Sequence, residues 1–281
     1  MLVVIVQLGA LVFVVSSMLA MGLSLTIPQI VEPLKNLRLV VVALVLNFIG
    51  APLVVWLIQA VLDLDEDLYT ALVLLAIAAG APFLPKLAQA ARGNMAFSVG
   101  LMILLMVVTV AFMPIALPLL ISGTSVEPWD IASSLIFLML LPLGIGLGVK
   151  ARYSDVADGL QPHMTQASTI AILILVVGGL ILQWEGIVSL IGTKGILAMA
   201  VLFVVLAIVG YVAGGSDRQT SSVLALGTAQ RNVSAALVVA VQNFGDRPDV
   251  VTTVMVGAIV GLVILLPLAG ELGKRAGPDE G

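Results

Sequence analysis

The chain lacks cysteine and carries little charge. None of its 281 residues is cysteine, one is histidine, and 10% are Asp, Glu, Lys or Arg. The absence of cysteine excludes disulfides and thiolate metal sites. A soluble domain typically has about 25% charged and about 45–50% apolar residues, whereas hydrophobic residues make up 61% of this chain. One aqueous domain cannot bury so much apolar surface, so the composition predicts a polytopic membrane protein.

Continuous apolar runs, rather than alternating patterns, mark the predicted membrane spans. A helix needs about 20 apolar residues to cross the roughly 30 Å hydrocarbon core, and continuous runs favour helices over β-strands. The first run lacks the basic residues of a secretory signal, so we predict that it is the first span. The runs of sufficient length lie at 2–24, 37–62, 67–91, 95–122, 131–150, 163–183, 194–214, 218–243 and 249–272. The sequence therefore predicts an all-α fold with about nine transmembrane helices.

Basic residues are distributed unevenly between the predicted loops. If the N-terminus is outside, the opposite, cytoplasmic side holds Lys35, Arg38, Arg92, Lys150, Arg152, Arg218, Lys274 and Arg275. The outer side holds only Lys194 and Arg247. Lysine and arginine are retained on the cytoplasmic side during insertion. We therefore predict a plasma membrane protein (the inner membrane in a bacterium) with its N-terminus outside and its C-terminus in the cytoplasm.

Away from their ends, the predicted spans contain two basic residues and no acidic residue. All sixteen Asp and Glu residues fall in or beside the predicted loops, whereas Lys86 and Arg231 lie within apolar runs. An arginine at the bilayer centre costs about 2.5–3.5 kcal/mol on insertion scales. Because no carboxylate is available as a partner, we interpret both residues as candidate binding groups for a mobile anion. Two simpler interpretations stay open: Lys86 extending its ammonium to the membrane surface, and Arg231 pairing with backbone carbonyls as a structural residue.

Both basic residues lie in spans that are interrupted. Pro82 and Pro85 precede Lys86, and each removes a backbone N–H and disfavours helix at the residue before it. Gly227 and Thr228 interrupt the span of Arg231 more weakly. Interruptions at corresponding positions of two halves indicate a transporter binding site. The order of the spans therefore predicts inverted repeats of four and five helices, each with one broken helix.

Polar residues near Arg231 complete the candidate site. Thr228, Gln230 and Asn232 flank this arginine, and Asn47 lies in the apolar segment LNFIGAP. Amide groups in apolar surroundings need hydrogen-bond partners. We predict that these four residues orient the bound group, and for Asn47 a purely structural role is an equal alternative.

Five motifs, in this order, resemble the bile acid:sodium symporter family and the wider superfamily that includes arsenite efflux carriers. They are MGLSL at 21–25, NFIGAPL at 47–53, ARGN at 91–94, LPLGIGLGVKAR at 141–152 and RNVSAALVVA at 231–240. The resemblance implies an inverted-repeat fold in which two broken helices cross near the bilayer midplane. It also implies a panel domain (1–24 and 131–183), a core or transport domain (37–122 and 194–272) and a cytoplasmic tail (273–281). Typical members have ten helices, so this chain would lack the first.

The departures from the family pattern fall on its two sodium sites. By spacing, a Ser-Asn pair of the first broken helix falls on Leu84 and Pro85. The glutamate of the second falls on Gly227, and a Gln-Asn pair becomes Arg231 and Asn232. The resemblance therefore implies that the sodium sites are lost, and we expect no cofactor and no metal.

These features predict a secondary transporter that moves an organic anion, a bile-acid-like carboxylate or sulfonate, by alternating access. Transport would be independent of sodium because Lys86 and Arg231 replace the bound cations. We expect the partners to be the anion and the lipid bilayer, with no nucleic acid. The sequence leaves the oligomeric state, the natural substrate and the direction of transport open.

Two other functions stay open, and one class is disfavoured. A sodium-coupled symporter with rearranged ligands is the alternative within the same class. An anion-selective channel with Arg231 at a constriction is the alternative from another class. An intramembrane enzyme would need a buried carboxylate pair, a metal cluster or a nucleophile with its base. The predicted spans contain none of these, so we do not expect an enzyme.

Overall fold

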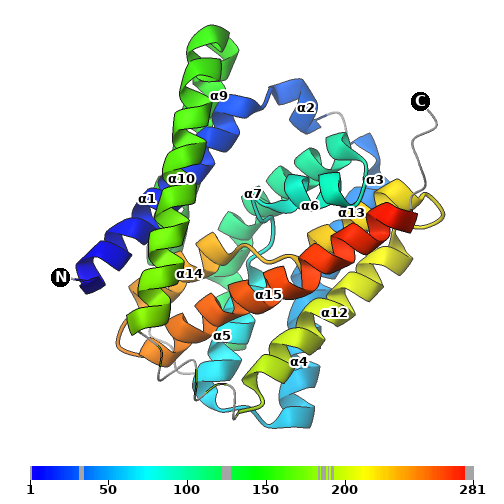
Figure 1. Ribbon diagram of the computed structural model, residues 1–281. Coiled ribbons are helices and arrows are strands. Elements are labelled where there is room, and N and C mark those ends of the chain that lie inside the picture. Colours follow the sequence, from blue (N-terminus) through cyan, green and yellow to red (C-terminus); the bar gives the residue numbers. More distant parts are fainter. Residues whose placement is uncertain are drawn as a thin grey trace.

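Helices account for the regular structure of the chain (Figure 1). The computed structural model describes residues 2–31, 35–121, 128–182, 184, 188, 190 and 193–275, and within these ranges there is no strand. The predicted all-α fold is therefore confirmed. The helices are α1 (Leu2–Ser24), α2 (Ile27–Val31), α3 (Leu37–Val45), the π-helix η2 (Leu46–Gly50), α4 (Ala51–Leu62), α5 (Glu66–Ile77), α6 (Leu84–Ala90), α7 (Met95–Leu120), α8 (Pro128–Leu135), the π-helix η3 (Ile136–Leu140), α9 (Leu141–Arg152), α10 (Ser154–Leu182), α12 (Gly195–Ala213), α13 (Arg218–Ala229), α14 (Val233–Asn243) and α15 (Pro248–Arg275).

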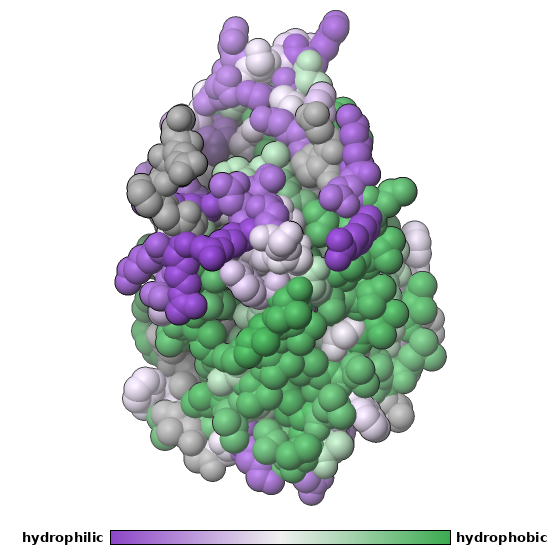
Figure 2. All heavy atoms as spheres, turned by 90° about the vertical axis from the view of Figure 1, so that its right-hand side faces the viewer, coloured by the Kyte–Doolittle hydropathy of each residue, from purple (hydrophilic) through white to green (hydrophobic). Residues whose placement is uncertain are grey.

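Several of these helices have the length and composition of membrane spans. Five stretches qualify among the described residues: Leu37–Leu62, Met95–Leu120, Gly195–Ala213, Arg218–Asn243 and Pro248–Arg275. Large apolar side chains such as Trp56, Leu119 and Val212 are exposed on the helices. Figure 2 shows a broad apolar face between hydrophilic ends. The chain is therefore an integral membrane protein, whereas a count of nine crossings stays a prediction.

Two differences from the predicted helix boundaries concern segments that were expected to be loop or tail. The predicted polar loop before residue 163 is mostly helix, because α10 begins at Ser154 and carries Asp155 in its first turn, where the helix dipole favours an acidic residue. The predicted cytoplasmic tail begins as helix, since α15 continues to Arg275, and residues 276–281 lie outside the described part of the chain.

The helices pack in two groups. Helix α1 packs against α9 and α10, and these three lie together at the left of Figure 1. In the other group α12 packs against α13 and α15, and α15 contacts α5 and α14. Helix α10 of the first group contacts α15 of the second, and further contacts join α8 to α7 and α14, and α2 to α7.

A glycine pair allows the backbones of α1 and α9 to touch. The sequence LPLGIGLG predicts that Gly144, Gly146 and Gly148 permit close packing. The structure confirms this for Gly146, where a Cβ atom would lie 2.6 Å from the carbonyl oxygen of Leu19 and 2.8 Å from the Cα of Gly22. The prediction is wrong for Gly144 and Gly148, which have no neighbour within 4 Å of a Cβ position.

Replacing Gly146 should therefore weaken the contact between α1 and α9. We expect Gly146→Ala to destabilise the purified protein by about 1–3 kcal/mol, because the added methyl group overpacks a backbone contact. Gly148→Ala is the matched control and should not lower the unfolding temperature. Thermal unfolding in detergent measures both. Equal unfolding temperatures for the two variants would contradict the proposed role of Gly146.

Candidate functional site

The first break separates α5 from α6. Helix α5 ends at Ile77, and Pro82 lies in a turn before α6 begins at Leu84. Gly80 has a positive φ of 78°, and a Cβ atom there would lie 2.2 Å from the backbone nitrogen of Met106, so only glycine fits. The Thr109 hydroxyl on α7 lies 3.0 Å from the backbone nitrogen of Ala79 and 3.1 Å from its carbonyl oxygen, and it pairs both groups.

Pro85 does not have the predicted role in this break. It lies in the first turn of α6, immediately after Leu84. Proline is well tolerated there because the first N–H groups of a helix have no intrahelical partner. Pro82 belongs to the break, and Pro85 starts the following helix.

The second break separates α13 from α14 and covers Gln230, Arg231 and Asn232. The prediction that Gly227 breaks the helix is wrong, because this residue lies inside α13. Its role is close packing instead. A Cβ atom on Gly227 would lie 2.9 Å from Leu101 Cδ2 and 3.1 Å from Leu84 Cδ2.

Asn232 joins the two breaks. Its backbone N–H donates to the carbonyl oxygen of Ala78 (2.8 Å), and its side-chain Nδ2 donates to that of Gly80 (3.0 Å). Its Oδ1 accepts from the backbone N–H of Ala235 (3.1 Å) and caps α14. Asn232 thereby satisfies backbone groups that no helix satisfies, which is a strong requirement at membrane depth.

Arg231 belongs to the second break and is 2% exposed. Its Nε donates to the carbonyl oxygen of Leu75 (2.9 Å), and its Nη2 donates to that of Ala76 (2.6 Å). Its Nη1 donates to the carbonyl oxygen of Thr228 (2.8 Å) and to Asn47 Oδ1 (2.9 Å). Four of its five N–H donors are thus paired with uncharged oxygens.

The partners of Arg231 are concentrated at helix ends. Leu75 and Ala76 lie in the last turn of α5, and Thr228 lies in the last turn of α13. Carbonyl groups in the last turn of a helix lack the usual intrahelical donors and form the negative end of its dipole, although that of Leu75 also accepts from the backbone N–H of Ala78 (3.3 Å). The guanidinium therefore occupies a cation site made by two converging helix C-termini. The structural alternative for Arg231, pairing with backbone carbonyls, describes what is observed.

Asn47 supplies the one side-chain oxygen among the four oxygens that pair with Arg231. It is fully buried in the π-helix η2, where its Nδ2 donates to the carbonyl oxygen of Ala43 (2.9 Å) while its Oδ1 accepts from Arg231. The wider π-turn is frequent at functional sites in helices. Here Asn47 connects η2 to the second break.

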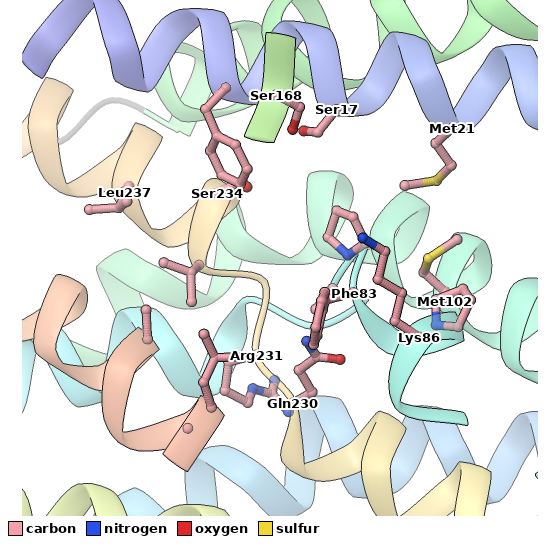
Figure 3. A pocket seen from close by; sticks show the side chains of 18 of the residues that line it. Ser17, Met21, Phe83, Lys86, Met102, Ser168, Gln230, Arg231, Ser234 and Leu237 are labelled. Carbon is pink, nitrogen blue, oxygen red and sulfur yellow. The ribbon is translucent and has the colours of Figure 1, made fainter. Parts of the chain in front are cut away.

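A cavity of about 580 Å³ lies in front of the breaks (Figure 3). Lys86, Gln230 and Arg231 line it, together with Pro82 and Pro85. The other predicted site residues are buried and do not line it: Asn47, Gly227, Thr228 and Asn232. The predicted site residues therefore form two sets, those that line the cavity wall and those that are buried in the protein.

Lys86 is the accessible cation of the cavity wall. Its side chain is exposed, and its Nζ lies 5.6 Å from the centre of the Phe83 ring. No Asp or Glu lies among the described residues that line the cavity. Lys86 and Arg231 therefore have different surroundings. The ammonium of Lys86 lies at an open cavity, whereas the guanidinium of Arg231 is hydrogen-bonded to oxygens of the protein.

The prediction missed the wall contributed by α1 and α10. Ser17 and Ser24 come from α1. Four residues come from α10: Gln161, Thr165, Ser168 and Thr169. Figure 3 shows Ser17 and Ser168 opposite Lys86 and Gln230. Their spacing of four, three and one residues along α10 places them on one helix face, and this is the signal from which they could have been found.

Removing the guanidinium should leave several buried oxygens unpaired. We expect Arg231→Ala to lower the stability of the purified protein strongly, because each unpaired buried acceptor costs about 1–3 kcal/mol. Lys86→Ala is the control and should leave the unfolding temperature unchanged, since Lys86 is exposed. Millimolar guanidinium should raise the unfolding temperature of Arg231→Ala relative to the same concentration of choline. An Arg231→Ala protein as stable as the unsubstituted protein would contradict a structural cation.

A comparison with known families identifies the scaffold. The model of the Sodium Bile acid symporter family matches residues 11–190, which is more than half of the chain. Helices α12 to α15, with the second break and Arg231, lie outside the matched residues. No curated protein matches the chain.

Proposed function

Because the chain belongs to the Sodium Bile acid symporter family, we propose that it is a secondary transporter of an organic anion that works without sodium. One observation carries the second part of this proposal: the guanidinium of Arg231 fills a site of converging oxygens that would otherwise suit a metal cation.

The first argument concerns the oxygens around Arg231. A sodium ion needs several oxygen ligands, and carbonyl groups at helix C-termini of broken helices are typical donors in transporters. Here Leu75, Ala76 and Thr228 use these oxygens to bind the guanidinium. A second positive charge beside it would be repelled strongly in a medium of low dielectric constant. We infer that Arg231 is a permanent substitute for one bound cation.

The second argument concerns the position of Gly227. By the family resemblance this residue stands where the sodium-binding members have a glutamate. The methyl groups of Leu84 and Leu101 fill the space that a side chain would need. Apolar groups offer no ligand to a hard cation such as sodium. The packing around Gly227 therefore supports loss of the other sodium site as well.

The cavity wall supports an amphipathic anion as the substrate. Lys86 supplies an accessible positive charge, and Val233 and Ser234 bring the N-terminus of α14, the positive end of its dipole, to the same wall. Much of the remaining surface is apolar, including Met21, Met102 and other large side chains. A single charged group on an apolar body matches this distribution. A bile-acid-like carboxylate or sulfonate is such a molecule.

Alternating access would use the two groups of helices. In this proposal the panel (1–24 and 131–183) and the core (37–122 and 194–272) move as rigid bodies and expose the cavity to each side in turn. The cavity is lined by α1 and α10 on one side and by both breaks on the other, which supports such a movement. The inverted repeats and the orientation with the N-terminus outside are part of the same proposal.

Uptake by proteoliposomes tests sodium independence. We expect equal initial rates of labelled cholate uptake with sodium, potassium or choline outside, because Arg231 cannot dissociate and carries no gradient energy. Uptake should saturate with cholate concentration, as a carrier requires and an open channel does not. Strict dependence on sodium would show that the protein is a sodium symporter with rearranged ligands.

The charge of Lys86 should control the affinity for the anion. We expect Lys86→Met to raise the KM for cholate about tenfold, the effect of losing about 1.4 kcal/mol, with a smaller change in kcat. Lys86→Arg should keep most of the affinity because it keeps the charge. Lys274→Met removes a positive charge that lies outside the cavity lining and serves as the control. An unchanged KM for Lys86→Met would exclude Lys86 as the anion-binding group.

A further inference from the structure

We infer that a second pocket, which lies where three helices end, binds the phosphate group of an anionic membrane lipid. This pocket has a volume of about 330 Å³. It is lined mainly by the C-terminal ends of α12 and α15 and by the N-terminal end of α13. No residue lines both this pocket and the cavity in front of the breaks. The inference therefore concerns a separate site and does not depend on the proposed substrate.

The pocket lies at the ends of membrane spans. Three of the stretches with the length and composition of spans begin or end here: Gly195–Ala213, Arg218–Asn243 and Pro248–Arg275. Figure 1 shows the C-terminal end of α15 beside the loop between α12 and α13. Figure 2, which faces this side of the molecule, shows hydrophilic side chains directly above the apolar face. Tyr211 of α12 lines the pocket, and tyrosine is enriched at the level of lipid headgroups.

The charge of the pocket is positive. Arg218 and Arg275 line it, and no Asp or Glu does so among the described residues. The Nε of Arg275 pairs with Glu271 Oε1 (3.0 Å). Arg218 has no such partner among the described residues, because its Nη1 donates to the uncharged backbone oxygen of Arg275 (3.2 Å). The neighbouring carboxylate, Asp217, caps α13 and accepts from Thr220 instead.

Ser222 adds a buried hydroxyl that lacks a partner. It lines the pocket and is 4% exposed, and its hydroxyl makes no hydrogen bond to the described residues. The hydroxyls of Thr220 and Ser221, one turn of the same helix, bond to Asp217 and Gly215. The Ser222 oxygen is not among the unpaired side-chain atoms that are fully enclosed, so it has surface open to the pocket. Buried polar groups are nearly always paired, and a ligand in the pocket would supply this partner.

The arginine determines the chemical class of the ligand. A hydroxyl both donates and accepts, so Ser222 fits many groups, whereas a guanidinium only donates. Its forked donors match the oxygens of a phosphate or a carboxylate. The depth of the pocket selects phosphate, because lipid phosphates are the anions concentrated where spans meet the membrane surface. In the proposed orientation this is the cytoplasmic surface, where anionic lipids attract basic groups.

The surroundings of the pocket favour a lipid that has a net negative charge. Ile208 and Val212 lie on α12 close to Tyr211 and are exposed, so acyl chains can pack on the helix while the phosphate reaches Arg218. A phosphatidylcholine headgroup would bring a quaternary ammonium toward two arginines. A phosphatidylglycerol headgroup brings no cation, and its glycerol hydroxyls can also bond to polar groups of the pocket.

The test measures the unfolding temperature of the purified full-length protein in dodecyl maltoside with added dioleoyl phosphatidylglycerol or dioleoyl phosphatidylcholine. A ligand that binds only the folded protein raises this temperature. We expect the phosphatidylglycerol to raise it by about 5 °C and the phosphatidylcholine to leave it unchanged. Inorganic phosphate and glycerol phosphate at the same concentration should have no effect, because they lack the contacts of the acyl chains.

Variants of the pocket connect the effect to its residues. Native mass spectrometry of the retained lipid gives the affinity directly. We expect Arg218→Gln to weaken phosphatidylglycerol binding about tenfold, the loss of a hydrogen-bonded charge pair, and Ser222→Ala to weaken it about threefold, the loss of one neutral hydrogen bond. Arg152→Gln is the control, since it removes an exposed arginine from the end of α9, outside the pocket lining. It should bind phosphatidylglycerol as the unsubstituted protein does.

Three results would overturn the inference. The two lipids could raise the unfolding temperature equally, or phosphatidylglycerol could bind Arg218→Gln and Arg152→Gln with the same affinity. An equal rise with inorganic phosphate would show that the pocket binds a soluble anion and no lipid. A failure of the proposed function would be observed separately, as an absence of anion uptake by a protein that still binds phosphatidylglycerol through Arg218.

Discussion

The site depends on the hydrogen bonds of one buried guanidinium. Two helices that break at membrane depth leave carbonyl groups without donors, and unpaired groups in hydrocarbon cost several kcal/mol each. Arg231 pairs oxygens from α5, α13 and η2 at once, and Asn232 pairs the exposed backbone of the first break. The irregular segments that shape the cavity wall can exist because these two adjacent residues satisfy them.

This arrangement separates the two kinds of helix ends. The negative C-terminal ends of α5 and α13 face a fixed cation inside the protein, while the positive N-terminal end of α14 and Lys86 face the cavity. In the proposed function the guanidinium balances these helix ends in place of a bound cation, and the positive groups that line the cavity remain available to an anion. In the proposed mechanism a fixed cation cannot supply gradient energy, so the anion would move down its own electrochemical gradient.

The sequence predicts the all-helical fold because membrane spans have a strong local signal, and Arg231 is a candidate because a charge in an apolar run is conspicuous. The contacts of Arg231 were not predictable, since backbone carbonyls such as those of Leu75 and Ala76 have no signature in the sequence and are more than 150 residues away. The prediction for Gly227 is wrong because its contacts also come from residues that are distant in the sequence. A glycine in a helix marks a break or a close contact, and only the positions of Leu84 and Leu101 show that it is a contact here.

Contacts between distant residues also explain why Lys86 and Arg231 are equivalent in the sequence and differ in the structure. Both are cations in interrupted spans without acidic neighbours, so hydropathy cannot distinguish them. Their chemistry can: the planar guanidinium has five donors in a rigid fork and suits several converging oxygens, whereas the ammonium is a compact charge on a flexible stem. A lysine in place of Arg231 could not reach carbonyl groups on three elements in the same geometry. The arginine therefore pairs the oxygens at the breaks, and in the proposed function the lysine binds the ligand that arrives and leaves.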